Sequence, residues 1–189
     1  MKNYALYYSY KGIGDVVIVM FEDKKATRYV KKGRVTVIYH DDEVIGYNIF
    51  DIKEILKIKS EGMIYLPSPA LVEVLNTILI NEGVEPLKIM ENSGYFTAKV
   101  QQINGNYARL SLGDKEINAS VKDDIRVNDN VVIAIKGTHL YNGKVVEDEA
   151  LVCTYKQLGI SIEDDRILHL DEDVEIGKDF FSSEVKIYD

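Results

Sequence analysis

The sequence predicts two domains: an α+β domain at residues 1–93, built from an antiparallel meander and a helix, and an all-β barrel at residues 94–189. The first observation behind this is a series of short β-rich runs with polar breaks, in both halves of the chain. The second is one amphipathic helix with cap signals at both ends, in the first half. The third is a pair of Asn-Gly turns, both in the second half.

Five β-rich runs fill most of the first fifty residues. The run RVTVIYH alternates, with Val35, Val37 and Tyr39 on one side of the strand. One face of the sheet is therefore expected in the core, and the other at least partly in water. The runs are Tyr4–Tyr10, Asp15–Glu22, Ala26–Lys31, Arg34–His40 and Glu43–Phe50.

A helix is predicted at Pro69–Glu82. Ser68 suits the N-cap, Pro69 the first helical position, and Gly83 the position after the C-cap. An apolar stripe at helical spacing is expected to pack on the sheet. It consists of Leu71, Leu75, Ile78 and Leu79. A shorter helix is also expected at Asp51–Ile58.

The second half contains strand-like runs joined by tight turns. Asn104-Gly105 and Asn142-Gly143 are strong hairpin signals, because both residue types tolerate positive φ. Five strands with such hairpins in ~60 residues are typical of the OB-fold barrel, which often binds single-stranded or looped nucleic acid. The runs are Tyr95–Ile103, Asn106–Leu112, Lys115–Val121, Asn130–Gly137 and a last strand within Lys144–Thr154.

Composition limits the classes of function. No apolar run approaches the ~20 residues of a membrane helix, and no export signal is evident, so we expect a cytoplasmic protein without a membrane partner. The single cysteine, Cys153, is expected in the core. His40, His139 and His169 have no zinc-ligand spacing, and no carboxylate pair has a catalytic context. We therefore expect no metal, no cofactor and no enzymatic activity.

The chain resembles the bacterial YtpR family over roughly Tyr7 to Phe181. In the first half the resemblance is carried by YYSYKGIGDVVIVMFE, VIGYNIFDI and LNTILINEGVE. In the second half it is carried by ASVKDDIRVNDNVVIAIKG and by DEALVCTYKQLGI, in which Cys153, Lys156, Leu158 and Gly159 match. The family's HPNADKL-type loop is replaced by INGNYARL, with Arg109 in the place of the lysine. The resemblance implies a small α+β domain followed by a tRNA-binding OB domain of the EMAP type.

The expected nucleic-acid site lies on the barrel. Its basic members are Lys99, Arg109, Lys136 and Lys156; Tyr107 is a candidate for base stacking, and Thr154 stands in the family motif. Residues 94–189 nevertheless contain 11 basic and 18 acidic residues, a net charge of −7. Two hypotheses stay open. The barrel binds tRNA or another structured RNA, or it has lost that affinity and contacts a protein instead.

A second basic region lies in the first half. Six cations occupy one eleven-residue window without an acid: Lys24, Lys25, Arg28, Lys31, Lys32 and Arg34. This window has two interpretations. It is the edge of a hairpin, where lysines prevent pairing with the edge of another sheet, or it is a hairpin that contacts nucleic-acid phosphates without base specificity. A homodimer is a further possibility, through the C-terminal segment VEIGKDFFSSEVKIY.

Overall fold

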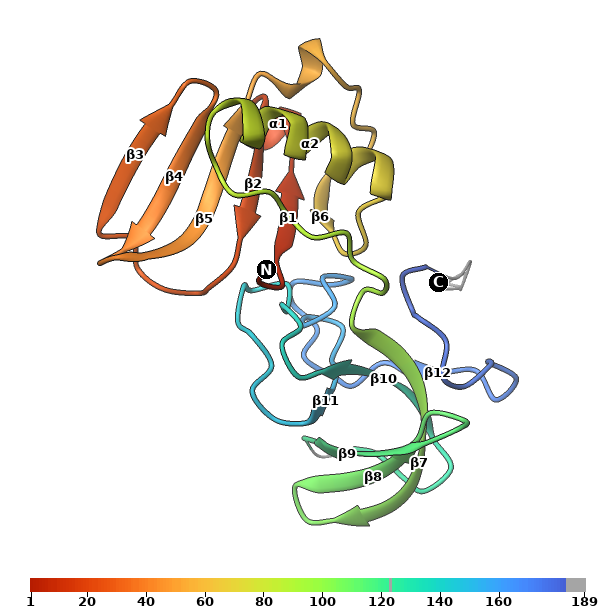
Figure 1. Cartoon of the computed structure of the whole chain (residues 1–189). Helices are drawn as coiled ribbons and strands as arrows, with labels where there is room; N and C mark the ends of the chain where they lie inside the picture. Colours follow the sequence, from red (N-terminus) through yellow and green to blue (C-terminus); the bar gives the residue numbers. More distant parts are fainter. Residues whose placement is uncertain (123, 183–189) are drawn as a thin grey trace. The chain divides into compact units, whose positions relative to one another are not determined.

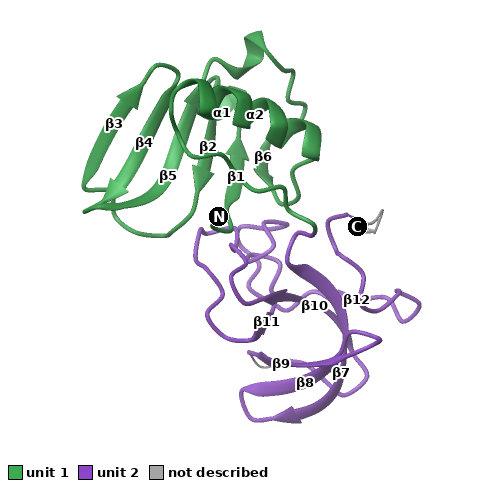
Figure 2. Cartoon of the chain, viewed as in Figure 1, with its two compact units in different colours: residues 1–91 green, residues 92–189 purple. Residues whose placement is uncertain are grey.

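A computed structural model describes residues 1–122 and 124–182 of the chain (Figure 1). The chain divides into two compact units, Met1–Glu91 and Asn92–Asp189 (Figure 2). Within the described residues, no helix has the length and apolar character needed to cross a bilayer. The predicted fold class is confirmed: an N-terminal antiparallel sheet with a helix is followed by a closed, mixed five-stranded barrel compatible with an OB fold.

The N-terminal unit is built on a six-stranded antiparallel sheet in the order β3-β4-β5-β2-β1-β6. Its strands are β1 Ala5–Tyr8, β2 Val16–Met20, β3 Arg28–Lys32, β4 Val35–His40, β5 Glu43–Phe50 and β6 Gly62–Ile64. The predicted meander holds for β1–β2 and for β3–β4–β5. A meander would also pair β2 with β3. In the structure β2 pairs with β5 instead, and β3 becomes the edge strand.

Three helical segments accompany this sheet: α1 Tyr10–Ile13, the 3₁₀ turn η1 Ile52–Glu54 and α2 Pro69–Asn81. Only α2 is long, and its ends follow the cap signals. The Ser68 hydroxyl accepts a hydrogen bond from the Leu71 amide, and Gly83 has a φ of 67°. α2 lies across one face of the sheet (Figure 1), and its buried residues Val72, Leu75, Ile78 and Leu79 belong to the core on that face. The helix expected at Asp51–Ile58 is only the η1 turn.

The sheet register separates two faces. On the helix-covered face, Leu6, Val17, Val35 and Ile49 are buried in the core beneath α2. We call the other side the open face. One row of directly paired residues on it runs Met63, Tyr7, Ile18, Asn48, Thr36 and Lys31. The adjacent row runs Ala5, Met20, Gly46, Ile38 and Tyr29.

The second unit contains β7 Tyr95–Asn104, β8 Tyr107–Ser111, β9 Glu116–Ser120, β10 Asn130–Ile135, β11 Ala150–Val152 and β12 His169–Leu170. Pairing proceeds from β7 to β8, β9, β11 and β10, and β10 pairs again with β7, so the barrel closes. The β9–β11 contact is parallel, and the other barrel pairings are antiparallel. Inward residues such as Val100, Leu110, Val131 and Ile133 are fully buried and form the barrel core.

The first hairpin of the barrel lies one residue from its predicted position. Asn104 pairs with Tyr107, so the loop consists of Gly105 and Asn106. Gly105 has a φ of 59°, which a residue without a side chain adopts at little cost. The second signal, at Asn142-Gly143, gives a turn with a single bridge between His139 and Val145 instead of an extended hairpin.

A C-terminal segment pairs beside the first half of β7. The Gly177 amide donates to the Thr97 carbonyl, and the Phe180 amide donates to the Tyr95 carbonyl. The Asp179 carboxylate accepts from the Ser93 amide and hydroxyl, both at 2.6 Å. The segment expected to support dimerisation is described only as far as Ser182, and its residues 183–188 lie outside the described residues.

Candidate nucleic-acid interface

The outer surface of β7, β8 and β9 carries three of the six predicted barrel residues. Tyr107 and Arg109 lie two positions apart on β8, and both are exposed. Lys99 on β7 pairs with Ser111, which places it diagonally across from Arg109 on the same surface. Alternation explains the arrangement, because Ala108 and Leu110 point into the barrel core. Tyr107 is 55% exposed, and its ring is accessible to a base.

The positive charge on this surface is partly neutralised. Arg109 Nε lies 3.7 Å from Glu116 Oε2 on β9, and both side chains are about half exposed. Asn118, which pairs directly with Arg109, is uncharged and exposed. Among the described residues, none forms an ion pair with Lys99. An anionic ligand on this surface therefore meets Lys99 directly but competes with Glu116 for Arg109.

Thr154 does not lie on the surface. Its side chain is 1% exposed, donates a hydrogen bond to Asp165 Oδ1 and accepts one from the Gln157 amide. This threonine connects the turn after β11 to the segment before β12. The expectation of a ligand contact is corrected here, because the burial of the hydroxyl leaves it a structural role.

Lys156 lies in the same turn, is exposed, and donates its backbone amide to the Asp164 carbonyl. Its charge helps to lower the pKa of Asp165, although the hydrogen bond from Lys122 contributes most. Lys122 Nζ lies 2.9 Å from Asp165. The Arg166 guanidinium bonds the Asp164 carboxylate and lowers its pKa to about 2. Two further cations of the barrel are thus paired with acids.

These pairs border a pocket of about 410 Å³ beside the β7–β8 turn. Its polar lining consists of Asn106 from that turn, the cations Lys122 and Arg166, and the acids Asp124 and Asp165. The sequence did not point to Lys122 or Arg166 as site residues, because acidic residues directly follow Lys122 and directly precede Arg166. The pairing of β8 with β9 brings the turn to the end of β9, where Val121 donates its amide to the Asn106 carbonyl.

Lys136 lies apart from Lys99. It follows β10 and donates its amide to the Glu149 carbonyl, whereas Lys99 pairs with Asn130 at the start of β10. The exposed acids Asp148 and Glu149 precede β11 at this end of the barrel. The structure thus brings Lys99, Tyr107 and Arg109 to one surface, but it does not gather all four predicted cations there.

The basic window of the N-terminal unit is divided between paired and unpaired cations. Lys24 bonds Glu43 at 2.6 Å, Arg34 bonds Glu54 at 3.1 Å, and Arg28 lies 3.9 Å over the Tyr39 ring. The three remaining side chains form no ion pair with a described residue. They are Lys25, Lys31 and Lys32.

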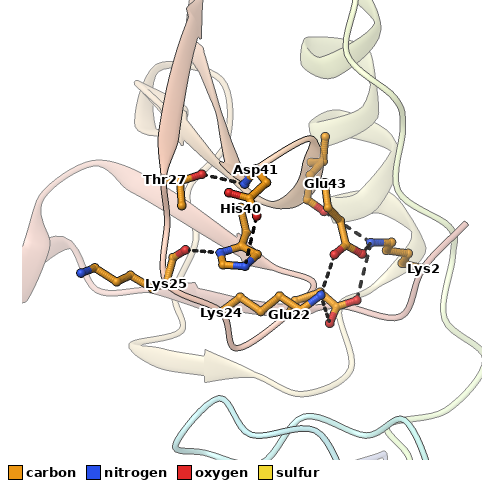
Figure 3. A network of polar contacts seen from close by, with 9 residues as sticks. Lys2, Glu22, Lys24, Lys25, Thr27, His40, Asp41 and Glu43 are labelled. Atoms are coloured by element: carbon orange, nitrogen blue, oxygen red, sulfur yellow. Dashed lines mark hydrogen bonds and ion pairs between the residues drawn. The ribbon is translucent and has the colours of Figure 1, made fainter.

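Figure 3 shows the network around Glu43. The Glu43 carboxylate lies between Lys2 at 2.8 Å and Lys24 at 2.6 Å, and Glu22 contacts both lysines. The bond from Lys2, followed by that from Lys24, lowers the pKa of Glu43 to about 2. Nearby, His40 Nδ1 lies 2.7 Å from the Lys25 carbonyl oxygen. The Lys24 ammonium is therefore already paired with carboxylates of its own unit.

No group of three or more metal-ligating side chains occurs within residues 1–122 and 124–182. The Cys153 thiol is buried, and burial raises its pKa well above the usual range. This thiol is therefore held in its protonated form and lacks the character of a nucleophile.

Part of the N-terminal unit is similar to a known protein family. Residues 22–88 match the family model of DUF4479, a domain of unknown function. The matched stretch lies inside the N-terminal unit and contains β3, β4, β5, β6 and α2. None of the curated proteins matches the chain.

Proposed function

We propose that this chain is a non-catalytic RNA-binding protein, with tRNA or another structured RNA as its ligand. The observation that carries the proposal is the exposed Tyr107 and Arg109 on the second strand of a closed five-stranded barrel. In OB folds the surface of the second and third strands and the adjoining loops bind oligonucleotides. The sequence resemblance to the YtpR family, whose second domain is of the tRNA-binding type, supports the same ligand.

The chemistry of this surface suits contacts to both parts of a nucleotide. The Tyr107 ring provides a stacking platform, and such stacking contributes ~1–3 kcal/mol per base. Lys99 and Arg109 provide phosphate contacts, and the pocket beside Asn106 offers further polar groups. The proposed mechanism is binding without chemistry, carried by stacking and counterion release.

A protein-contact module that has lost RNA affinity is the second candidate. It is favoured by the paired state of Arg109, Lys122 and Arg166, each of which already bonds a carboxylate. The net charge of −7 in residues 94–189 favours it as well. Its partner would be a protein with a basic surface.

A titration against bulk tRNA at two salt concentrations separates the two functions. We expect binding that weakens as salt increases, with a slope of roughly −0.7 to −0.9 per neutralised phosphate. Arg109→Glu should weaken this binding and reduce the slope. The matched control is Arg126→Glu, since Arg126 is exposed in the β9–β10 connection, outside the β7–β8–β9 surface.

Two outcomes contradict the proposal. The absence of tRNA binding at low salt would leave the protein-contact function. Equal effects of Arg109→Glu and Arg126→Glu would show that the measured affinity is a nonspecific response to charge, independent of the barrel surface.

A further inference from the structure

The open face of the N-terminal sheet contains no carboxylate in its two central rows. Those rows comprise eleven residues contributed by all six strands, and the single charged residue among them is Lys31. The whole chain carries 31 acidic residues and a net charge of −8. An acid-free surface of this size therefore differs in charge from the rest of the molecule.

The same face presents apolar and aromatic side chains. Tyr29 on the edge strand β3 is 64% exposed, and Phe50 at the end of β5 is 38% exposed. Tyr7, Ile18 and other members are partly exposed and are absent from the core beneath α2. Asn48 and Thr36 place an amide and a hydroxyl in the middle of the central row. This combination offers stacking surfaces together with donors and acceptors for base edges.

One cation without an ion pair to a described residue lies on this face at β3. Lys31 ends the central row, whereas Lys32 pairs with the core residue Val35 on the helix-covered side, and Lys25 precedes β3. Lys31 forms no ion pair with a described residue, in contrast to Lys24, Arg34 and the paired barrel cations Arg109, Lys122 and Arg166. Because no carboxylate has to be displaced, Lys31 is available to a phosphate backbone.

The two central rows suit a short ligand. Six strands at a spacing of ~4.8 Å span about 24 Å, and the two rows extend about 13 Å along the strands, roughly 300 Å² in all. Phe50, which pairs with Val16, lies beyond these rows and extends the face. A four-stranded RRM sheet stacks two or three bases. The rows therefore match an occupant of three or four nucleotides, and a second copy of the chain is the alternative that the binding measurement tests.

We propose that the open face of the N-terminal sheet binds a short stretch of single-stranded nucleic acid. The bases contact the surface around Tyr29 and Phe50, and the phosphates contact Lys31. This surface lies on a different unit from the barrel site, so it extends the proposed function without requiring it. In a chain that binds structured RNA through the barrel, this face takes an unpaired segment.

The test uses the full chain with fluorescein-labelled hexauridylate and the matching DNA, hexathymidylate, in fluorescence anisotropy at low salt. Truncating the exposed aromatics with Tyr29→Ala and Phe50→Ala should each raise Kd at least fivefold. Lys31→Glu should weaken binding and reduce its salt dependence. Equal affinities for the two oligomers identify single strands in general, and tighter binding of hexauridylate identifies RNA.

Matched controls come from the helix-covered side of the same unit. Ile80→Ala removes an apolar side chain of α2 that is 59% exposed. Lys57→Glu reverses an exposed charge between Leu56 and Ile58, which pack against the core beneath α2. Neither control should change the affinity for the oligomer. Circular dichroism of every variant should match the wild type, since all of the substituted side chains are exposed or at the edge.

Three results would overturn the proposal. They are the absence of oligomer binding by the wild type, unchanged Kd values in all three open-face variants, and a loss of self-association in those variants without a loss of oligomer binding. The last result would assign the face to a second copy of the chain. Arg109→Glu separates the two proposals. It should reduce the affinity of the barrel for tRNA and leave the affinity of the open face for hexauridylate unchanged.

Discussion

Arg109 on β8 and Glu116 on β9 form an ion pair across two strands, with Nε and Oε2 3.7 Å apart. The pair sits in the middle of the surface that we propose for RNA. Each phosphate that binds Arg109 must therefore displace a carboxylate. Since both side chains are about half exposed, the pair contributes only ~0.2–1 kcal/mol, and a ligand can replace it.

We predict that Glu116→Gln increases tRNA affinity by about 1.5- to 5-fold, the equivalent of releasing an exposed pair of that strength. The salt dependence should become steeper, because Arg109 becomes a full phosphate contact. The control is Glu175→Gln, which makes the same charge change beside Lys178 on the C-terminal segment. Equal gains in both variants would show that net charge, rather than Arg109, limits binding.

Local signals allowed much of the fold to be predicted. The ends of α2 follow from Ser68, Pro69 and Gly83, because caps act within one turn of the chain. The pairing of β2 with β5 was missed, since it depends on a non-local choice between two possible neighbours for an apolar strand. β6 was also missed, because a three-residue edge strand has too short a pattern to be recognised.

The candidate site was less accessible to sequence reasoning. Tyr107 and Arg109, which the sequence offered as an aromatic and a basic residue of the barrel, are both exposed because side chains alternate along β8. The burial of Thr154 depends on Asp165, eleven positions further along the chain, and no local pattern indicates that contact. The acid-free open face becomes visible only when the register of six strands is known.

We predict that Thr154→Val destabilises the barrel without changing its affinity for tRNA. The substitution leaves the Gln157 amide without its acceptor and removes the donor to Asp165. A buried unsatisfied group costs ~1–3 kcal/mol, so the melting temperature should fall by several degrees. Thr154→Ser keeps the hydroxyl and should recover most of the loss. A large drop in RNA affinity in a folded Thr154→Val protein would return Thr154 to the interface.

We predict an acid-sensitive contribution to stability from Glu43. Its pKa in the folded chain is about 2, below its ordinary value of 4.5, because Lys2 and Lys24 both bond its charged form. A depressed pKa contributes stability above the unfolded value, and the contribution is lost as pH falls from about 4.5 toward 2.

Melting temperatures of the wild type and Glu43→Gln, measured from pH 7 to pH 2, test this assignment. The two proteins should differ most at neutral pH and converge at the acid end. Glu73→Gln is the control, since Glu73 is exposed on α2 and forms no ion pair with a described residue. Parallel curves for Glu43→Gln and the wild type at every pH would contradict the role of the network in Figure 3.

We predict that the C-terminal segment requires glycine at position 177 in order to pair beside the first half of β7. Its φ is 83°, and a Cβ at this position would lie 2.0 Å from the Leu112 carbonyl oxygen. Gly177→Ala therefore combines backbone strain with a collision against backbone atoms, and should cost about 2 kcal/mol or more. Gly105→Ala is the matched control in the same unit, because its φ is 59° but no atom lies within 4 Å of the added Cβ. Calorimetry should show a larger drop in melting temperature for Gly177→Ala than for Gly105→Ala. Similar drops in the two variants would mean that the segment moves away from Leu112 without cost, and that β7 does not need it for its stability.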